Sequence, residues 1–430
     1  METVTKYPLS EAQYSVVKDK SVLIFGSKNN IGDFIFSGLN FRDSDVTEYL
    51  EDSSDLNDFK NKHYDVVVVH GFQYEGMSLD TNFINEVKKT NISCDVFLID
   101  MLGEGYKLAF RIKNFRLDIF NQNEVKLLTP FYDYKGLEEK YPNIEFFKYE
   151  LAGPLNLCSR FNHTFHHDHT HGVYGENAQQ VVVGVRYSEK KRNKLFTCLN
   201  NNMVLHRDFM VHVLDKYGLL DYGYVSNRNG SDSYKHMLIS ESNGEEEYVY
   251  YSRNIKIDSG NLEERFKLQS YETDSYVSLV TETYYGILQF ITEKSMKPFY
   301  ALQLPLIFGC DGTVEILRKH GFDMFDDIID HSYDDVGLSQ FEVDDWIEET
   351  TEYNTLVKKK SEMIGEQLKK LSNLDIHQIY LDIKDRLLYN QNLVYKLTIE
   401  DNTLIEDYGR WIFGDNITFK KNDYIEKLYI

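Results

Sequence analysis

The sequence predicts an α/β protein with two open parallel sheets in series, followed by a helical extension. In the first half of the chain, short apolar runs that end in small or polar residues alternate with helical candidates. The alternation begins again near residue 194, and long amphipathic helix follows after about residue 336. Apolar runs rich in β-branched residues are typical of strands buried on both faces, which occur in parallel sheets covered by helices.

Length and charge restrict the class of protein. The 430 residues exceed what one compact core usually holds, so two domains are expected. The 47 Lys and Arg residues against 69 Asp and Glu residues give a net charge of −22, which repels nucleic acid and anionic membranes unless a local basic patch is present. Residues 1–20 lack the apolar core of a secretion signal, and no apolar run is long enough to span a bilayer. A cytoplasmic protein without membrane insertion is therefore expected.

The strands expected in the first half follow four apolar runs. These are SVLIFGS, YDVVVVHG, CDVFLIDM and EVKLLTPF, at residues 21–27, 64–71, 94–101 and 124–131. TNFINEVKKT, residues 81–90, is one of the helices expected between them. This half is predicted to form one α/β domain.

The second α/β pattern opens with the strand KLFTCLNN at residues 194–201. A helix follows, in which Phe209, Met210, Val213 and Leu214 recur at helical spacing. Later elements are the strand YVSLVTET, a helix over residues 293–302 and the strand LPLIFG. In the C-terminal helices, one apolar stripe is predicted to face the core, formed by Leu356, Met363, Ile364, Leu368 and Leu371.

These patterns divide the chain into three parts. Residues 1–185 are predicted to form an N-terminal α/β domain and residues 186–340 a second α/β domain. Residues 341–430 are predicted to form C-terminal helices that pack back across both domains.

No metal or dinucleotide cofactor is expected. FGSKNNIGDF, after the first strand, lacks the third glycine and the spacing of G-x-G-x-x-G. The four cysteines form no C-x-x-C pair. A loop with five histidines has no H-E-x-x-H spacing, so a polar interdomain loop is favoured over a transition-metal site, which is the alternative. Its histidines are His163, His166, His167, His169 and His171.

Two strand-to-helix corners carry residues suited to a nucleotide ligand. LFTCLNNNMVLHRDF places an Asn-rich turn, including Asn201, and then Arg207 at the start of a helix. A helix N-terminus attracts anions, and a guanidinium adds a fork that matches phosphate. About ninety residues later, Thr292, Glu293 and Lys294 begin another helix.

The second corner has two interpretations. A carboxylate beside an ammonium suits a nucleotide sugar, because the carboxylate accepts from ribose hydroxyls and the ammonium meets the diphosphate. Alternatively, Thr292 is only the N-cap of a helix in a capping box. The pairing with Arg207 in the preceding strand-to-helix unit favours the ligand site.

The order of these motifs resembles a known family. A strand, N-x-x-x-x-x-R and a helix, followed by VTET, ITEK and PLIFG, is similar to the donor-binding half of GT-B glycosyltransferases, in particular the α1,3-fucosyltransferase and exostosin-like group. The resemblance covers about residues 190–335. It implies a GT-B-like fold, in which two Rossmann-like domains face a central cleft and a C-terminal helix returns to the first domain.

The resemblance also implies roles for individual residues. Arg207 and Lys294 would bind the diphosphate of a nucleoside-diphosphate sugar, and Glu293 would hold the ribose. Thr292 and Asn201 are expected neighbours, and Glu282 of VTET is expected to line the same pocket. Families of this kind usually need no metal, because basic side chains and a helix dipole neutralise the leaving diphosphate.

The acceptor side has fewer signals. An inverting transfer needs a group that takes the proton of the acceptor hydroxyl. Strand ends in the first domain offer His70, Asp100 and Glu104, and Asp33 follows the first strand. Asp100 and Glu104 are preferred, because glycines beside Glu104 allow a substrate close to the backbone.

The sequence thus predicts a glycosyltransferase with two candidate acceptors. One is a glycan. The other is a hydroxymethylated DNA base. The chain is low in Pro and rich in Asn, Tyr, Lys and Ile, which resembles the proteins of phages with AT-rich genomes. The basic runs RIKNFR and RYSEKKRNK are candidates for a DNA-binding stripe. The rival from another class is a non-catalytic nucleotide- or glycan-binding module or a structural assembly protein. The sequence leaves the sugar, the base and the oligomeric state open.

Overall fold

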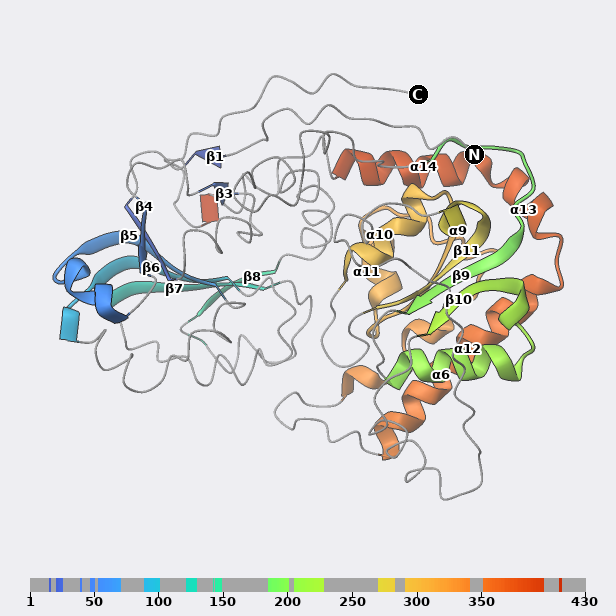
Figure 1. Cartoon of the computed structure of the whole chain (residues 1–430), viewed down its shortest axis with the longest axis horizontal. Coiled ribbons are helices and arrows are strands. Elements are labelled where there is room, and N and C mark those ends of the chain that lie inside the picture. Colours follow the sequence, from blue (N-terminus) through green and yellow to red (C-terminus); the bar gives the residue numbers. More distant parts are fainter. Residues whose placement is uncertain are drawn as a thin grey trace. The chain divides into compact units, whose positions relative to one another are not determined.

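The computed structural model describes residues 15–16, 21–25, 39–40, 47–50, 53–70, 89–100, 121–129, 142, 144–148, 185–200, 205–227, 270–282, 291–340, 351–397 and 410–411. The chain divides into two compact units. One comprises Leu9–Tyr174 and Ile399–Lys427, and the other comprises Met1–Pro8, Gly175–Thr398 and Leu428–Ile430. We name them the N-terminal unit and the C-terminal unit, after the part of the sequence that forms the sheet of each (Figure 1).

The sheet of the N-terminal unit has the strand order β4-β2-β5-β6-β7-β8, and all neighbouring strands are parallel. Its strands are β2 (Val22–Phe25), β4 (Thr47–Leu50), β5 (His63–His70), β6 (Ser93–Asp100), β7 (Asn121–Thr129) and β8 (Glu145–Lys148). A separate parallel pair and a 3-10 helix complete the described elements: β1 (Ser15–Val16), β3 (Leu39–Asn40) and η1 (Ser53–Phe59).

The apolar runs of the sequence form the central strands of this sheet. Val66, Val67 and Val68 of β5 and Leu98 of β6 are buried, as expected for strands covered on both faces. The four strands predicted here are confirmed. The edge strands β4 and β8 were not predicted, because each has four residues and mixes polar with apolar side chains.

The sheet of the C-terminal unit has the order β10-β9-β11-β12, and it is also parallel throughout. Its strands are β9 (Lys194–Asn200), β10 (Gly223–Asn227), β11 (Ser275–Thr281) and β12 (Leu304–Phe308). All residues of β11 and β12 are buried, which agrees with their apolar sequences. β9, β11 and β12 were predicted, whereas the short strand β10 was not.

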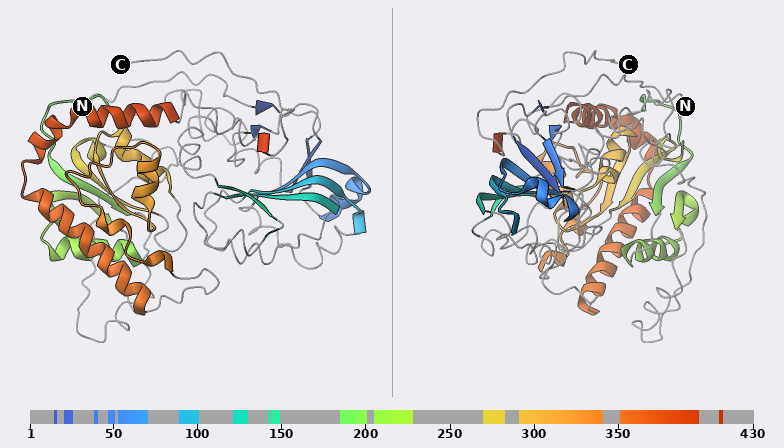
Figure 2. Two further views of the ribbon diagram at one scale, coloured as in Figure 1. Left: turned by 180° about the vertical axis from the view of Figure 1, so that it is seen from behind. Right: turned by 60° about the vertical axis from the view of Figure 1, so that its left-hand side comes forward.

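Helices cover both faces of this second sheet. Figure 2 shows α6 and α12 on one face, and α10 and α14 on the other. The helices are α6 (Leu205–Lys216), α9 (Ser270–Thr273), α10 (Glu293–Tyr300), α11 (Thr313–Lys319), α12 (Thr351–Ser372), α13 (Ile376–Asp382) and α14 (Lys384–Tyr395). The structure also describes the 3-10 helices η3 (Leu220–Tyr222), η4 (Ser332–Asp334) and η5 (Leu338–Gln340). The predicted α/β class, with a parallel sheet in each half, is confirmed.

The long helix α12 packs closely against α6. A Cβ atom added to Gly365 would lie 2.3 Å from Cγ1 of Val213 and 2.9 Å from Cε2 of Tyr217, so only glycine permits this approach. Within the predicted apolar stripe of α12, Ile364, Leu368 and Leu371 are buried. The other two members of the stripe are only half-buried, and Val357 and Lys360 occupy the buried face in their place.

The region predicted as one C-terminal helical extension is divided between the two units. α12, α13 and α14 belong to the C-terminal unit, and the segment that begins at Ile399 belongs to the N-terminal unit. Across the described ranges, every helix is too short or too polar to cross a bilayer.

Candidate functional site

The order of strands in the C-terminal sheet defines a position where ligands commonly bind. The chain leaves β9 through α6 and returns as β10 on one side of β9, whereas β11 and β12 lie on the other side. The direction of strand addition therefore changes between β9 and β11. In open α/β sheets, the carboxyl ends of the two strands at such a switch point flank a crevice that receives ligands.

A row of buried polar side chains crosses the carboxyl edge of the sheet at this point. Ser226, Asn200 and Thr281 end β10, β9 and β11, or lie next to those ends. The backbone N–H of Asn200 donates to Oγ of Ser226 at 3.0 Å, and the Thr281 hydroxyl donates to Oδ1 of Asn200 at 2.5 Å. These bonds fix three neighbouring strand ends to one another.

The first residues of α6 bind the end of β11. His206 lies fully buried, and its Nε2 donates to the backbone oxygen of Glu282 at 2.8 Å. Because a carbonyl oxygen only accepts, Nε2 carries the ring hydrogen. Burial lowers the pKa of His206 well below its usual range, and the neighbouring positive charge of Arg207 lowers it further. His206 is therefore neutral, and its hydrogen bond connects α6 to the end of β11.

Arg207 reaches the same strand end. Its side chain is 6% exposed, and Nη2 donates to the backbone oxygens of Thr281 at 3.4 Å and Glu282 at 3.3 Å. The helix that follows β9 is thus tied to the end of β11 by two consecutive residues, His206 and Arg207. The guanidinium lies at the switch point, and its binding of a diphosphate stays a prediction.

The carboxyl group of Glu282 joins this corner to the start of α10. It accepts hydrogen bonds from the Thr292 backbone N–H at 3.0 Å, the Thr292 hydroxyl at 2.5 Å and the Ser295 hydroxyl at 2.5 Å. Glu282 has no exposed surface. It was predicted to line the ligand pocket, and the structure shows that its carboxyl oxygens bind the first turn of α10.

Thr292 is the N-cap of α10, as the alternative interpretation of this corner required. Its backbone is extended, and its Oγ1 accepts from the backbone N–H of Lys294 at 3.3 Å. This corner differs from a capping box, in which the side chain of a Glu three residues after the cap accepts from the backbone N–H of the cap residue. Here that position is Ser295, and Glu282 of the preceding strand-to-helix corner supplies the carboxylate.

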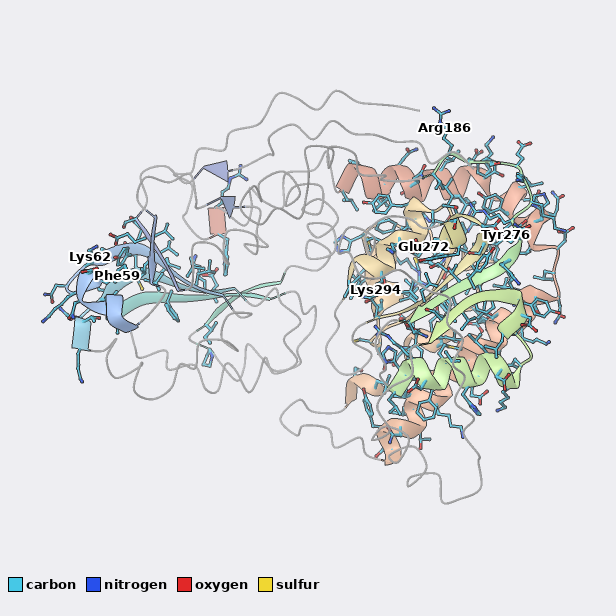
Figure 3. The ribbon with its side chains drawn as sticks, viewed as in Figure 1. Phe59, Lys62, Arg186, Glu272, Tyr276 and Lys294 are labelled. Carbon is cyan, nitrogen blue, oxygen red and sulfur yellow. The ribbon has the colours of Figure 1, made fainter. Side chains whose placement is uncertain are left out.

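Lys294 is the half-buried cation of this second corner. Its Nζ donates to Oγ1 of Thr292 at 3.3 Å. Figure 3 labels it beside α10, on the opposite side of the unit from Tyr276 near the start of β11. Arg207 from α6 and Lys294 from α10 are joined through Glu282 and Thr292, and their convergence on one diphosphate stays a prediction.

The other predicted site residues are placed in part or not at all. Glu293 begins α10 and Asp100 ends β6, but their side chains lie outside the described part of the chain. Asn201, Glu104 and the histidine-rich loop also lie outside the described residues. Sequence reasoning missed Asn200, which carries the polar row, although the apolar-to-polar change at the end of KLFTCLNN marks this position as well as the next.

The prediction of a basic stripe formed by RYSEKKRNK is corrected for Arg192. Arg192 is 4% exposed, and its guanidinium donates to Ala301 O at 3.1 Å and Tyr380 Oη at 2.7 Å. Its run precedes β9 and therefore lies at the amino ends of the strands. β9 has seven residues, so about 20 Å separates this run from the switch point at the carboxyl ends. Arg192 serves the interior of the unit.

Among the residues that the structure describes, no group of three or more His, Cys, Asp or Glu side chains is arranged to hold a metal ion. The second run considered for the stripe, RIKNFR, and the histidine-rich loop lie in ranges that are not described. Two described residues, Arg207 and Lys294, place a cation at the switch point, each from the first turn of a helix.

Comparison with known proteins gives matches to solved structures only. Neither family models nor curated protein sequences match the chain. The DNA modifying enzyme β-glucosyltransferase, solved in the presence and absence of the substrate uridine diphosphoglucose, has a TM-score of 0.45 and 12% identity over 91% of this chain and 99% of its own. An α1,3-fucosyltransferase has a TM-score of 0.33 and 11% identity over 89% of this chain and 94% of its own. At such low identity, the roles of this chain's residues rest on its own geometry.

Proposed function

We propose that this protein is a glycosyltransferase that moves a sugar from a nucleoside-diphosphate sugar to an acceptor hydroxyl. The observation that supports this proposal is the meeting of two strand-to-helix corners at the switch point of the C-terminal sheet. Arg207 and Lys294 come from separate helices and are linked through two buried residues, Glu282 and Thr292. Two cations from helix starts suit the two phosphate groups of a nucleoside diphosphate.

In this proposal, the side chains supply the charge that a metal would otherwise supply. Arg207 and Lys294 stabilise the negative charge that grows on the diphosphate as it leaves the sugar. Glu293, the first residue of α10, accepts from the ribose hydroxyls. The reaction then needs no metal cofactor and no second organic cofactor, only the sugar nucleotide as co-substrate.

The transfer is proposed to invert the anomeric carbon. The acceptor oxygen attacks that carbon, its proton passes to a carboxylate, and the bond to the diphosphate breaks with its electron pair. Asp100 or Glu104 is the proposed base. Asp100 ends β6, a central strand of the N-terminal sheet, and is in register with His70 of β5 and Leu128 of β7. It therefore stands at a carboxyl edge, where ligands of parallel sheets bind.

Donor binding is tested with thermal melting in the presence of a panel of nucleoside diphosphates. We expect one of them to raise the melting temperature of the wild type, because a ligand present at about 100 times its Kd adds about 2.7 kcal/mol to the free energy of unfolding. Arg207→Ala and Lys294→Ala should each lose most of this shift. Lys297→Ala is the matched control, since Lys297 lies on the same helix and pairs with Glu272. If both site variants respond as the wild type does, the site is wrongly assigned.

A non-catalytic nucleotide- or glycan-binding protein is the alternative, and it would give the same melting shifts. The two are separated by incubating the protein with sugar nucleotides and following the donor by mass spectrometry. A glycosyltransferase is expected to hydrolyse its donor slowly without an acceptor, since water replaces the acceptor hydroxyl. Binding without any turnover, with all candidate acceptors present, would favour the binding protein.

The acceptor is proposed to be either a glycan or a hydroxymethylated base of phage DNA. The burial of Arg192 removes one cation from the basic stripe that DNA would need, and the net charge of −22 opposes DNA as well. Affinity for DNA measured over a series of salt concentrations separates the two acceptors, because a protein that contacts phosphates loses affinity steeply as salt rises.

A further inference from the structure

Glu282 is placed to organise the site without contacting a ligand. Its backbone oxygen accepts from His206 and Arg207, and its carboxyl oxygens accept from the N-cap Thr292 and from Ser295 of α10. The side chain is fully buried. A residue with these contacts determines where the two helix starts stand relative to each other.

The Thr292 hydroxyl connects the Glu282 carboxyl group to Lys294 through hydrogen bonds. A hydroxyl has one hydrogen and two acceptor positions. The hydrogen points to Glu282 at 2.5 Å, and the oxygen accepts from the Lys294 backbone N–H and the Lys294 ammonium, each at 3.3 Å. With its hydrogen committed to a carboxylate, the oxygen presents its acceptor side to the ammonium, and such a chain of bonds strengthens each member.

The same arrangement weakens the start of α10 itself as an anion site. The Thr292 N–H is taken by Glu282, and a carboxylate at a helix N-terminus offsets the positive end of the helix dipole. The positive charge that this corner presents to a ligand is therefore carried mainly by the ammonium of Lys294, so its position matters.

We infer that Glu282 is a positioning residue that acts through Thr292 to hold the Lys294 ammonium in place for a nucleoside diphosphate. This inference rests on the proposed function. A lysine side chain that is already ordered loses less conformational freedom when the ligand binds, which raises affinity without a new contact to the ligand. Glu282 and Thr292 are assigned no contact with the reacting atoms.

The test compares the affinities of three variants for the nucleoside diphosphate that gives the largest melting shift. Thr292→Val removes the hydroxyl at nearly constant shape and is expected to weaken binding about tenfold, the loss typical of one hydrogen bond to a charged group. Thr292→Ser keeps the hydroxyl and should bind within about twofold of the wild type. Ser295→Ala is the matched control, because it removes a hydroxyl bond to the same carboxylate that does not involve Lys294.

A double-mutant cycle separates positioning of the ammonium from simple capping of the helix. In a Lys294→Met background, Thr292→Val should have no further effect on affinity, because the group that it positions is gone. An equal loss in both backgrounds would mean that only the helix cap matters, and would overturn the inference. Unchanged binding by Thr292→Val, with weakened binding by Lys294→Met, would overturn it as well and leave the proposed function standing. If the wild type binds no nucleoside diphosphate, both the inference and the proposed function are wrong.

Discussion

At the scale of single residues, the interior of the C-terminal unit contains ionic groups whose partners come from distant elements. Lys360 of α12 has no exposed surface, and its Nζ lies 3.1 Å from Oδ1 of Asp311, which is 4% exposed and follows β12. The other carboxyl oxygen of Asp311 accepts from the backbone N–H groups of Gly337 and Ser339. This pair fastens α12 to the carboxyl edge of the sheet.

Breaking the pair from one side is expected to be costly. Lys360→Met leaves the Asp311 carboxylate buried without its cation, and we expect a loss of about 3 kcal/mol in the free energy of unfolding. Lys359→Met is the matched control, since Lys359 is the exposed neighbour on the same helix and should change stability by less than about 0.5 kcal/mol. Urea denaturation followed by circular dichroism measures both. In the double variant Lys360→Met/Asp311→Asn, part of the loss should be recovered, and strict additivity would contradict a direct pair.

Residue types alone did not reveal which charged side chains are internal. Lys360 lies in the polar run KKKSE and Arg192 in the basic run RYSEKKRNK, and neither run marks one of its cations as buried. Their burial depends on acceptors supplied by other elements, such as Tyr380 for Arg192. Only the fold brings these acceptors close, because Tyr380 is 188 residues away along the chain.

Among the elements, the sequence is most informative for strands rich in buried apolar residues, which include the central strands of each sheet and the edge strand β12. β5 and β11 are apolar on both faces, and this pattern is independent of their neighbours. β4, β8 and β10 lie at the edges of the sheets as far as the structure describes them, and polar residues are tolerated at such edges. Their sequences therefore carry little periodic signal.

In the candidate site too, some features follow from the local sequence, and others depend on contacts between separate segments. Thr292 as N-cap and the placement of Arg207 at a helix start follow from local sequence, and both are present. The role of Glu282 does not follow from it, because its partner Thr292 is ten residues further along the chain, at the start of the next helix. The link between the corners required the strand order β9-β11, which the sequence does not specify.

At the scale of the whole molecule, the chain passes from the C-terminal unit to the N-terminal unit after Thr398. We name residues 399–427 the returning segment. Trp411 of this segment contacts the N-terminal sheet. Nε1 of Trp411 donates to Oε1 of Glu145 at 2.6 Å, and Nζ of Lys126 lies 5.1 Å from the centre of the Trp411 ring and bonds to its backbone oxygen. Trp411 therefore joins β7 and β8 to a part of the chain 285 residues after Lys126.

We expect Trp411 to anchor the returning segment and to stabilise the N-terminal unit selectively. Trp411→Ala removes both the ring over Lys126 and the indole bond, and should lower the free energy of unfolding of this unit by about 2 kcal/mol, less than for a fully buried tryptophan. Trp411→Phe keeps a ring over the ammonium and should lose less than half as much.

Hydrogen exchange read by mass spectrometry should show faster exchange in β7, β8 and the segment after Thr398, with the strands β9 to β12 unchanged. Tyr222→Ala, at a side chain that is 49% exposed in the C-terminal unit, controls for loss of a surface aromatic. Uniformly faster exchange in both units would show that the tryptophan supports the molecule as a whole and that the anchor is not confined to the N-terminal sheet.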